Sequence, residues 1–457
     1  MGLNDDWRAR SLRAVWHPCT QMKLHAPEGR AQPLVPVARA EGVWLHDHEG
    51  ARILDGISSW WVNLFGHNHP AIRAALIDQL HTLDHVMLAG FTHAPVVELS
   101  ERLSRLTGLG HAFYGSDGAS ATEIALKMSA HYWRNSGRPG KSRFVGIAGG
   151  YHGETVGALA VTDIALFREA YAPLVRLAAT APSPDARQAA PGETAADVAE
   201  RAAAALDAYL AEHAGETAAV IAEPLIQCAA GMAMHEPLYV RRLRELCDRH
   251  DVHLVLDEIA VGFGRTGTLF AHEQAGIRPD FLCLSKGLTG GTLPLSAVLT
   301  TEAVYAAFYD DEVARGFLHS HSYTGNPLAC RAALATLDLI EQTGVLAANR
   351  ATSERLWAQF APLSEHERVR HARRQGMVFA WDVATSLPDF ARRYARHALA
   401  RGLLLRPIGH TLYAMPPYVI DEAEGEHLAR GALAALQATL AEEGEGAAQA
   451  QGVVDGV

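Results

Sequence analysis

The chain has 457 residues and a formal net charge of -11, with 51 acidic side chains against 40 lysines and arginines. This balance argues against nucleic-acid binding, which needs clustered basic residues, and the length predicts more than one domain. The five cysteines are scattered without a C-x-x-C pair, the first residues carry no secretory signal, and no apolar run is long enough to span a membrane. A cytoplasmic protein with reduced thiols is therefore expected.

The first 60 residues mix proline, histidine and tryptophan with short strand-like runs, such as the one at 42–45. We predict that residues 1–60 form part of a small α+β domain. The H-x-H spacing, which can hold zinc on a strand, occurs three times, at His46 and His48, His67 and His69, and His319 and His321. No third ligand stands at a fixed distance from any pair, so no metal site is predicted.

Residues 61–335 alternate short apolar runs with helical patterns, which predicts a large α/β domain whose mostly parallel sheet is covered by helices. Within it, 180–194 is interpreted as a linker and 195–213 as an amphipathic surface helix. Five predicted strands end in small or polar residues, and they lie near 111–114, 144–148, 219–222, 253–256 and 281–284. Because open α/β sheets bind ligands at the carboxyl ends of their strands, these ends predict one site.

The first of these strands leads into Gly118 and Ala119, at the start of a predicted helix. Ser120 and Glu123 have the spacing of a capping box. The unpaired amides and the dipole of a helix N-terminus favour an anion, so the segment is either a phosphate cradle at Gly118 and Ala119 or an ordinary capped helix. Asp117 would repel a phosphate and is expected to point away from it.

Tyr151 and His152 lie in the glycine-rich turn 149–153 that follows the second strand. Glycines let the backbone turn sharply and leave the tyrosine ring at the edge of the sheet. The ring could stack on a flat cofactor or pack within the turn, and both interpretations stay open. His152 is interpreted as a structural, hydrogen-bonded group.

An aspartate and a lysine follow the last two buried strands. Asp257 ends the apolar run 252–256, so its carboxylate is expected to be partly buried and to need a cation, which a protonated pyridine or Arg265 could supply. Lys286 follows 281–284, where burial would lower the pKa of its amine and make it nucleophilic. Alternatively it is a surface lysine whose stem lies along apolar residues. The pair favours a lysine that forms a Schiff base with pyridoxal phosphate and an aspartate that holds the pyridine nitrogen.

Residues 336–445 are predicted to complete the small α+β domain, and 446–457 are expected to be a disordered tail. The predicted helices of this part of the chain lie at 325–342 and 388–401, and the predicted strands at 377–381, 403–406 and 411–414. Arg406 ends one of these strands. It suits bidentate recognition of a carboxylate, although a salt bridge between domains is equally open.

The segments 254–267 and 279–286, which contain Asp257 and Lys286, resemble the class III aminotransferases of the fold type I, pyridoxal-phosphate-dependent family. The similarity extends from about residue 12 to residue 435. It implies the fold of that family, an aminotransferase activity, pyridoxal 5'-phosphate as cofactor, and a homodimer with active sites at the interface.

Five further segments resemble the branch of this family that acts in biotin synthesis, and they are 16–20, 55–61, 85–95, 288–291 and 413–418. The resemblance implies transfer of the amino group of S-adenosylmethionine to 8-amino-7-oxononanoate, which gives 7,8-diaminononanoate. It implies Lys286 as the catalytic residue. The implied cofactor-binding residues are Gly118, Ala119, Tyr151, Asp257, Lys286, His321 and Ser322, the last two reaching the phosphate across the dimer. The implied substrate-binding residues are Trp60, Tyr151, Lys286, Ser320 and Arg406.

The chain also departs from the pattern of this family. Cys19 stands where a tyrosine is common, Ala119 where a serine is familiar in the phosphate loop, Glu154 where many relatives have aspartate, and 319–323 where Gly-Pro-Thr is common. The alternatives are therefore lysine as amino donor, or an ω-amino acid–pyruvate aminotransferase. From other classes, a pyridoxal-phosphate-binding regulator and a zinc hydrolase are also considered.

Overall fold

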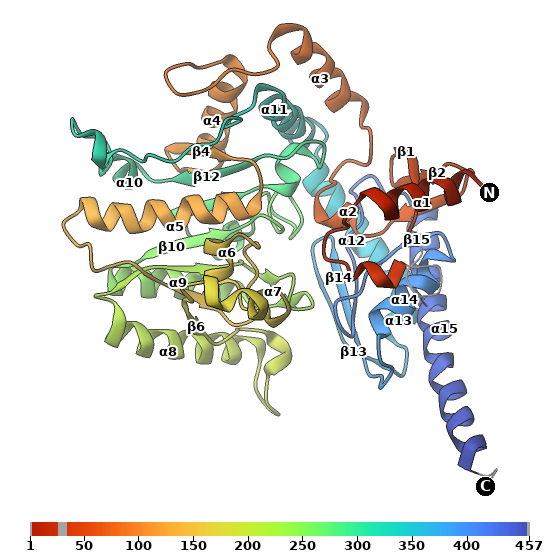
Figure 1. The fold of residues 1–457 in the computed structure, drawn as a ribbon. Coiled ribbons are helices and arrows are strands. Elements are labelled where there is room, and N and C mark those ends of the chain that lie inside the picture. The colour runs from red at the N-terminus through yellow and green to blue at the C-terminus, as the bar shows by residue number, and fades with distance from the viewer. Residues whose placement is uncertain (1, 26–33, 455–457) are drawn as a thin grey trace. The chain divides into compact units, whose positions relative to one another are not determined.

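The computed structural model describes residues 2–25 and 34–454, and the chain divides into two compact units (Figure 1). The central unit is Pro70–Asn349, and the terminal unit combines Met1–His69 with Arg350–Val457. Among the described residues, no helix combines the length and the apolar character needed to cross a membrane.

A seven-stranded sheet with the order β4-β12-β11-β10-β7-β5-β6 organises the central unit. Its strands are β4 (His111–Gly115), β5 (Arg143–Ile147), β6 (Ala179–Ala181), β7 (Thr217–Ala222), β10 (His253–Asp257), β11 (Phe281–Leu284) and β12 (Ser296–Thr300). Only β12 runs antiparallel to its neighbours, so the carboxyl ends of the other six strands share one edge. The mostly parallel sheet is confirmed, and all five strands followed in the sequence belong to it.

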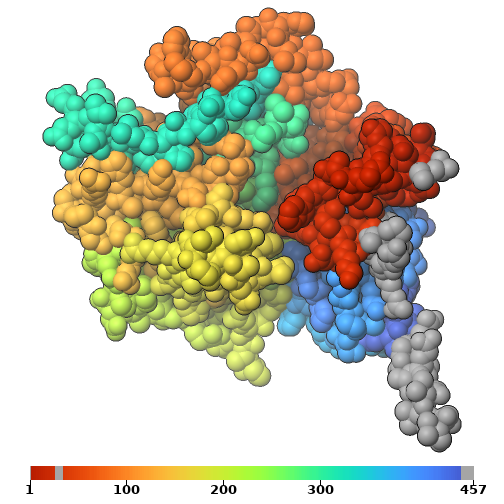
Figure 2. All heavy atoms as spheres, in the orientation of Figure 1, coloured from red at the N-terminus to blue at the C-terminus, as the bar shows by residue number. Residues whose placement is uncertain are grey.

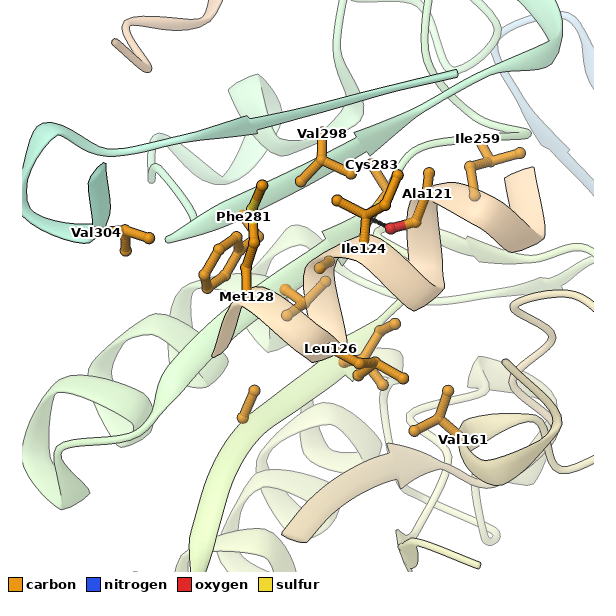
Figure 3. Close-up of a cluster of buried hydrophobic side chains, with 14 residues drawn as sticks. Ala121, Ile124, Leu126, Met128, Val161, Ile259, Phe281, Cys283, Val298 and Val304 are labelled. Atoms are coloured by element: carbon orange, nitrogen blue, oxygen red, sulfur yellow. Dashed lines mark hydrogen bonds between the residues drawn. The ribbon is translucent and has the colours of Figure 1, made fainter. Parts of the chain in front are cut away.

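The sheet is apolar on both faces because both are covered. All residues of β7 and β11 are buried, as expected for strands in the interior of a parallel sheet. On one face, helix α5 (Gly118–Asn135) packs Ala121 and Ile124 against Cys283 and Val298 (Figure 3). The small Ala121 lets the start of α5 approach the strands closely. The other long helices of this unit are α3 (Pro70–Thr82), α4 (Ala94–Thr107), α8 (Ala195–His213), α9 (Pro237–His250) and α11 (Pro327–Gln342).

The interpretation of 180–194 as a linker is wrong. Residues 179–181 form the edge strand β6, in which Ala179 pairs with Val145 of β5, and Asp185 in the following turn is buried. A strand of three residues is too short to stand out in an Ala- and Pro-rich sequence. The helix predicted next is confirmed as α8, which begins after Thr194 with a capping box.

The terminal unit contains two small sheets and several helices, consistent with an α+β arrangement. One sheet has the order β1-β2-β3-β15 and the other β13-β14-β16. The strands are β1 (Val37–Glu41), β2 (Trp44–Asp47), β3 (Arg52–Asp55), β13 (Val369–Gln375), β14 (Val378–Val383), β15 (Leu403–Leu404) and β16 (Thr411–Ala414). The helices include α1 (Leu3–Ala14), α14 (Phe390–Leu399) and α15 (Glu422–Val454).

Parallel pairing of Leu403 with Leu54 joins the two ends of the chain in one sheet. The strand predicted at 403–406 is only two residues long, so Arg406 lies beyond it. The segment predicted to be a tail is helical as far as Val454, and its last three residues lie outside the described part of the chain.

Candidate active site

A buried carboxylate–imidazole pair lies at the edge of the sheet where the parallel strands end. Asp257 is the last residue of β10 and is 3% exposed. Its Oδ2 lies 2.7 Å from Nδ1 of His152, and its Oδ1 accepts a hydrogen bond from the amide of Ile259 at 3.0 Å. His152 follows β5, and β5 and β10 lie on either side of β7. The structural interpretation of His152 therefore missed a partner of the predicted site residue, and the position of His152 after another strand of the same predicted sheet was the available signal.

A second buried carboxylate, Glu223, follows β7 between these two strands. Its Oε2 accepts a hydrogen bond from the amide of Tyr151 at 3.0 Å, and its Oε1 accepts one from the amide of Cys228 at 3.1 Å. Burial raises the pKa of Glu223 to about 7; His152 opposes this rise and Asp257 adds to it. The sequence predicts a strand at 219–222 with a polar end, and Glu223 is the carboxylate directly after it.

Lys286 follows β11 after a single residue, Ser285. Its backbone has a φ of 43°, in the left-handed region that residues with a Cβ rarely adopt, and Ser285 is held by a hydrogen bond from its Oγ to the carbonyl of Leu295 at 2.7 Å. Burial lowers the pKa of Lys286, while Asp257 and Glu223 are among the groups that oppose this shift. Strained backbone of this kind is concentrated at functional sites. The structure thus brings a lysine of lowered pKa to the edge that carries both carboxylates.

The start of helix α5 lies against the segments that carry Asp257 and His152. A Cβ on Gly118 would lie 2.9 Å from Cγ2 of Ile259, two residues after Asp257. Gly153, whose φ is +121°, lies so close to Ala119 that a Cβ on it would be 2.5 Å from the Cβ of Ala119. Only glycine fits at these two approaches, so they fix the helix start beside the strand ends.

The predicted capping box at this helix is wrong. The N-cap is Asp117, whose Oδ1 accepts a hydrogen bond from the amide of Ser120 at 2.8 Å. Glu123 instead accepts hydrogen bonds from Thr155 Oγ1 and from the amide of Gly157, both at 2.7 Å. Asp117 has the extended backbone that an N-cap requires, so it takes the role assigned to Ser120.

Tyr151 is held at both ends. Its amide donates to Glu223, as described above, and its hydroxyl donates to Oε1 of Glu154 at 2.8 Å. Its ring centroid lies 5.5 Å from that of Phe167. The tyrosine is therefore fixed beside the strand ends, where its ring was expected.

The remaining predicted residues of the central unit lie on a loop before α11. Ser320 and Ser322 are exposed. The amide of His321 donates to Thr324 Oγ1 at 3.1 Å, and its Nδ1 accepts from the amide of Tyr323 at 3.2 Å. His321 is thus hydrogen-bonded within its own loop. This loop contains none of the residues described above at the strand ends, which are His152, Glu223, Asp257 and Lys286.

The two predicted substrate residues of the terminal unit lie together. The guanidinium carbon of Arg406 is 4.8 Å from the centroid of the Trp60 ring, a cation–π contact. Trp60 belongs to the short element α2 (Ser58–Trp61), whose backbone is left-handed.

Comparison with known proteins decides the family. The sequence profile described as Aminotransferase class-III matches residues 25–436. The chain belongs to the class III aminotransferases. The family expected from the segments around Asp257 and Lys286 is therefore confirmed, and the fold type I architecture with it.

Class III relatives with assigned names cover nearly the whole chain. A Helicobacter pylori protein named adenosylmethionine-8-amino-7-oxononanoate aminotransferase is 43% identical over 93% of this chain and 96% of its own length. A Geobacter sulfurreducens protein with the same name is 38% identical over 93% and 95%.

Solved structures of class III enzymes have the same fold. The aminotransferase of the same name from Methanocaldococcus jannaschii matches with a TM-score of 0.87 and 33% identity, covering 95% of this chain and 99% of that one. An amine transaminase from an uncultivated Pseudomonas species, in its PLP-bound internal aldimine form, matches with 0.86 and 32% over 92% and 98%. The omega transaminase from Pseudomonas jessenii in complex with PMP matches with 0.89 and 25% over 96% and 98%.

Proposed function

We propose that this class III aminotransferase transfers the amino group of S-adenosylmethionine to 8-amino-7-oxononanoate and forms 7,8-diaminononanoate in biotin synthesis. The observation that carries the substrates is the 43% identity, over almost the entire length of both chains, to a relative named for this reaction. The reaction type is supported by the lysine of lowered pKa beside two buried carboxylates. We expect the enzyme to act in the cytoplasm.

The central unit offers a set of groups that fits pyridoxal 5'-phosphate. The Asp257 carboxylate has lone pairs beyond those used by His152 and Ile259, so it can also accept from a protonated ring nitrogen. The amides of Gly118 and Ala119 precede the first intrahelical hydrogen bond of α5 and suit a phosphate. The bound cofactor would supply an electron sink for the substrate carbon.

Lys286 is assigned the proton transfers. Its lowered pKa makes the amine neutral at a lower pH than that of an exposed lysine. A neutral amine can remove the proton from the α-carbon of the donor as a general base, and its conjugate acid would release that proton to the bound cofactor within the same half-reaction. In the second half-reaction the direction reverses, and the amine would deliver a proton to the reacting carbon of the keto acid. Asp257 is held by its hydrogen bond with His152, so its carboxylate keeps one orientation. Tyr151 is fixed through its amide and its hydroxyl, and we assign its ring to packing against the cofactor and the substrate.

Trp60 and Arg406 are assigned to the substrate. The guanidinium carbon lies over the indole, 4.8 Å from its centroid, and the N–H groups of the planar guanidinium can make two parallel hydrogen bonds to a carboxylate. 8-Amino-7-oxononanoate has a terminal carboxylate on an alkyl chain, so Arg406 can bind the carboxylate and the Trp60 indole can pack against the alkyl chain.

A homodimer is proposed from an apolar surface of the central unit. Figure 2 displays the region of α3 in orange above the segment before α11 in teal. The His85 and Tyr323 rings lie 4.9 Å apart, and Nε2 of His93 lies 2.9 Å from the carbonyl of Gly325, so the two segments are neighbours. The large exposed apolar side chains of residues 70–93 and 309–323 are Ile77, Leu80, Met87, Phe91, Tyr309, Val313, Leu318 and Tyr323.

Contiguous exposed apolar groups mark an interface, and Ser320, His321 and Ser322 belong to the second of these two segments. A second copy could therefore present Ser320 to the substrate and the other two residues to the phosphate. Sedimentation of the purified protein checks the dimer: a mass of two chains is expected, and a single-chain mass at micromolar concentration would contradict it.

A donor panel tests the proposed function. The cofactor-loaded enzyme is mixed in turn with S-adenosylmethionine, lysine, β-alanine and ornithine, and the loss of the cofactor absorbance is followed. S-Adenosylmethionine is expected to convert the cofactor, and 8-amino-7-oxononanoate to restore it. Conversion by the ω-amino acids alone, with recovery by pyruvate, would favour the second candidate, an ω-amino acid–pyruvate aminotransferase, which the similarity to the P. jessenii omega transaminase supports. If lysine converts the cofactor and S-adenosylmethionine does not, the product is still 7,8-diaminononanoate but the amino donor is lysine.

A further inference from the structure

The element α2 is a left-handed turn made entirely of residues that have a Cβ. The φ angles of Ser58, Ser59, Trp60 and Trp61 are 52°, 47°, 71° and 74°. Left-handed backbone is unfavourable for L-residues and normally occurs at single positions. Four such residues in succession persist only where the surrounding structure holds them.

Asp55, the last residue of β3, holds the middle of this turn. Its side chain is completely buried. Its Oδ1 accepts from the amides of Ile57 at 3.4 Å and Ser59 at 2.9 Å, and its Oδ2 accepts from the Ser59 hydroxyl at 2.7 Å. The same Oδ2 lies 2.9 Å from Nε2 of His67. One carboxylate thus receives three hydrogen bonds from the turn region and is itself held by an imidazole.

The two ends of the turn are attached to another segment of the terminal unit. The Ser58 hydroxyl donates to the carbonyl of Met415 at 2.7 Å, and Nε1 of Trp61 donates to the Tyr413 hydroxyl at 3.1 Å. Between these attachments, Trp60 is 42% exposed, and its ring carries the guanidinium of Arg406. These attachments therefore fix the backbone on both sides of Trp60, and its indole is left exposed between them.

We propose that Asp55, oriented by His67, is a positioning residue for substrate specificity: it holds the left-handed turn that keeps Trp60 against Arg406. This inference rests on the proposed assignment of Trp60 and Arg406 to the substrate. The cation–π contact with the indole restrains the guanidinium, so its donors keep one direction for a carboxylate. The ligand selected in this way is a keto acid whose carboxylate is separated from the reacting carbon by an alkyl chain.

The test uses Asp55→Ala, with Asp55→Asn as the conservative variant and Ser59→Ala as a milder one. The matched control is Asp47→Asn, because Asp47 ends β2 in the same sheet and also accepts from turn amides, those of Glu49 at 2.9 Å and Ala51 at 2.8 Å. Near-ultraviolet circular dichroism without substrate reports the indole, with Trp60→Phe as the reference. KM for 8-amino-7-oxononanoate and the rate of the donor half-reaction are measured separately.

Asp55→Ala is expected to lose the dichroism that Trp60→Phe loses, and to raise KM for the keto acid roughly tenfold with the donor half-reaction nearly unchanged. Asp55→Asn should recover part of both losses, and Asp47→Asn should match the wild type. An unchanged dichroism and KM would overturn the proposal, as would an equal fall of both half-reactions. If Asp55→Ala does not fold, Ser59→Ala decides by the same two readouts.

The failure of the proposed function gives a different result. If Trp60→Phe and Arg406→Lys leave KM for the keto acid unchanged, the assignment of these residues to the substrate is wrong. The dichroism without substrate still reports whether Asp55 holds the turn.

Discussion

The two units of the chain position their functional side chains in different ways. In the central unit, regular structure positions them: Asp257, Glu223 and Lys286 lie at one edge because each stands at or just after the carboxyl end of a strand of the same direction. In the terminal unit, Trp60 is placed by a left-handed turn. This backbone conformation is unfavourable for its residues, and hydrogen bonds to Asp55 and Met415 hold it. The groups proposed to react thus depend on the sheet, whereas the groups proposed to bind the substrate depend on a local strained backbone. Variants in the two units should therefore fail in different kinetic parameters.

The largest effect is expected in the central unit from Lys286→Ala. Loss of the amine removes the group assigned to both proton transfers, so both half-reactions should slow by roughly a thousandfold or more. Single-turnover measurements with donor and with keto acid check this expectation. Transamination retained at the wild-type rate would refute the role of Lys286, provided that circular dichroism shows a folded chain.

A smaller effect is expected from Asp257→Asn. The amide cannot supply the negative charge that a protonated ring nitrogen needs, and a preorganised charge of this kind is worth on the order of a hundredfold. Both half-reactions should slow alike, and KM for the keto acid should stay near that of the wild type. If Asp257→Asn raised KM for the keto acid and left the rates of both half-reactions unchanged, variants in the two units would not differ in the kinetic parameter that they affect.

Arg406→Lys in the terminal unit should give the opposite pattern. Lysine keeps the positive charge but loses the planar pair of donors, so KM for 8-amino-7-oxononanoate should rise about tenfold. The donor half-reaction should be unaffected, and steady-state kinetics with each substrate varied in turn measures both. An equal change in the donor half-reaction would mean that Arg406 serves the chemistry rather than the keto acid.

The smallest effect on turnover, and the only one seen mainly in stability, is expected from Glu223→Gln. Burial raises the folded-state pKa of Glu223 to about 7, above its usual value near 4.5. Because the folded state binds the proton of Glu223 more tightly than the unfolded state, this group contributes its full stabilisation below pH 4.5. The contribution is lost as the pH rises through 7, which lowers the free energy of unfolding by at most about 3 kcal/mol. The wild type should lose stability relative to Glu223→Gln between pH 5 and 8, as measured by the urea midpoints of the cofactor-free proteins. Parallel pH profiles would show that Glu223 is charged throughout.

The strand ends of the central unit could be predicted because a buried parallel strand is an apolar run, and a polar residue directly after it stands out. Asp257 and Lys286 were recognised in this way. His152 and Glu223 follow strands of the same sheet, yet their partners come from other strands, and a single sequence does not tell which ends meet. The helix start was located, but the choice of Asp117 over Ser120 as N-cap depends on backbone angles that neither residue type dictates.

The turn of the terminal unit could not have been predicted. Left-handed backbone is expected at glycine, whereas 58–61 reads Ser-Ser-Trp-Trp. Its conformation depends on Asp55 from the preceding strand and on Met415, more than three hundred residues away. Trp60 and Arg406 were named by resemblance, and their contact is a product of the tertiary structure.

Transfer of a labelled amino group shows directly which donor and which acceptor the enzyme uses. S-Adenosylmethionine carrying 15N in its amino group is incubated with the cofactor-loaded wild type and 8-amino-7-oxononanoate, and the product is analysed by mass spectrometry. We expect 7,8-diaminononanoate with the label in its new amino group, and no labelled product from Lys286→Ala. Unlabelled product, or label that enters only from an ω-amino acid, would contradict this expectation.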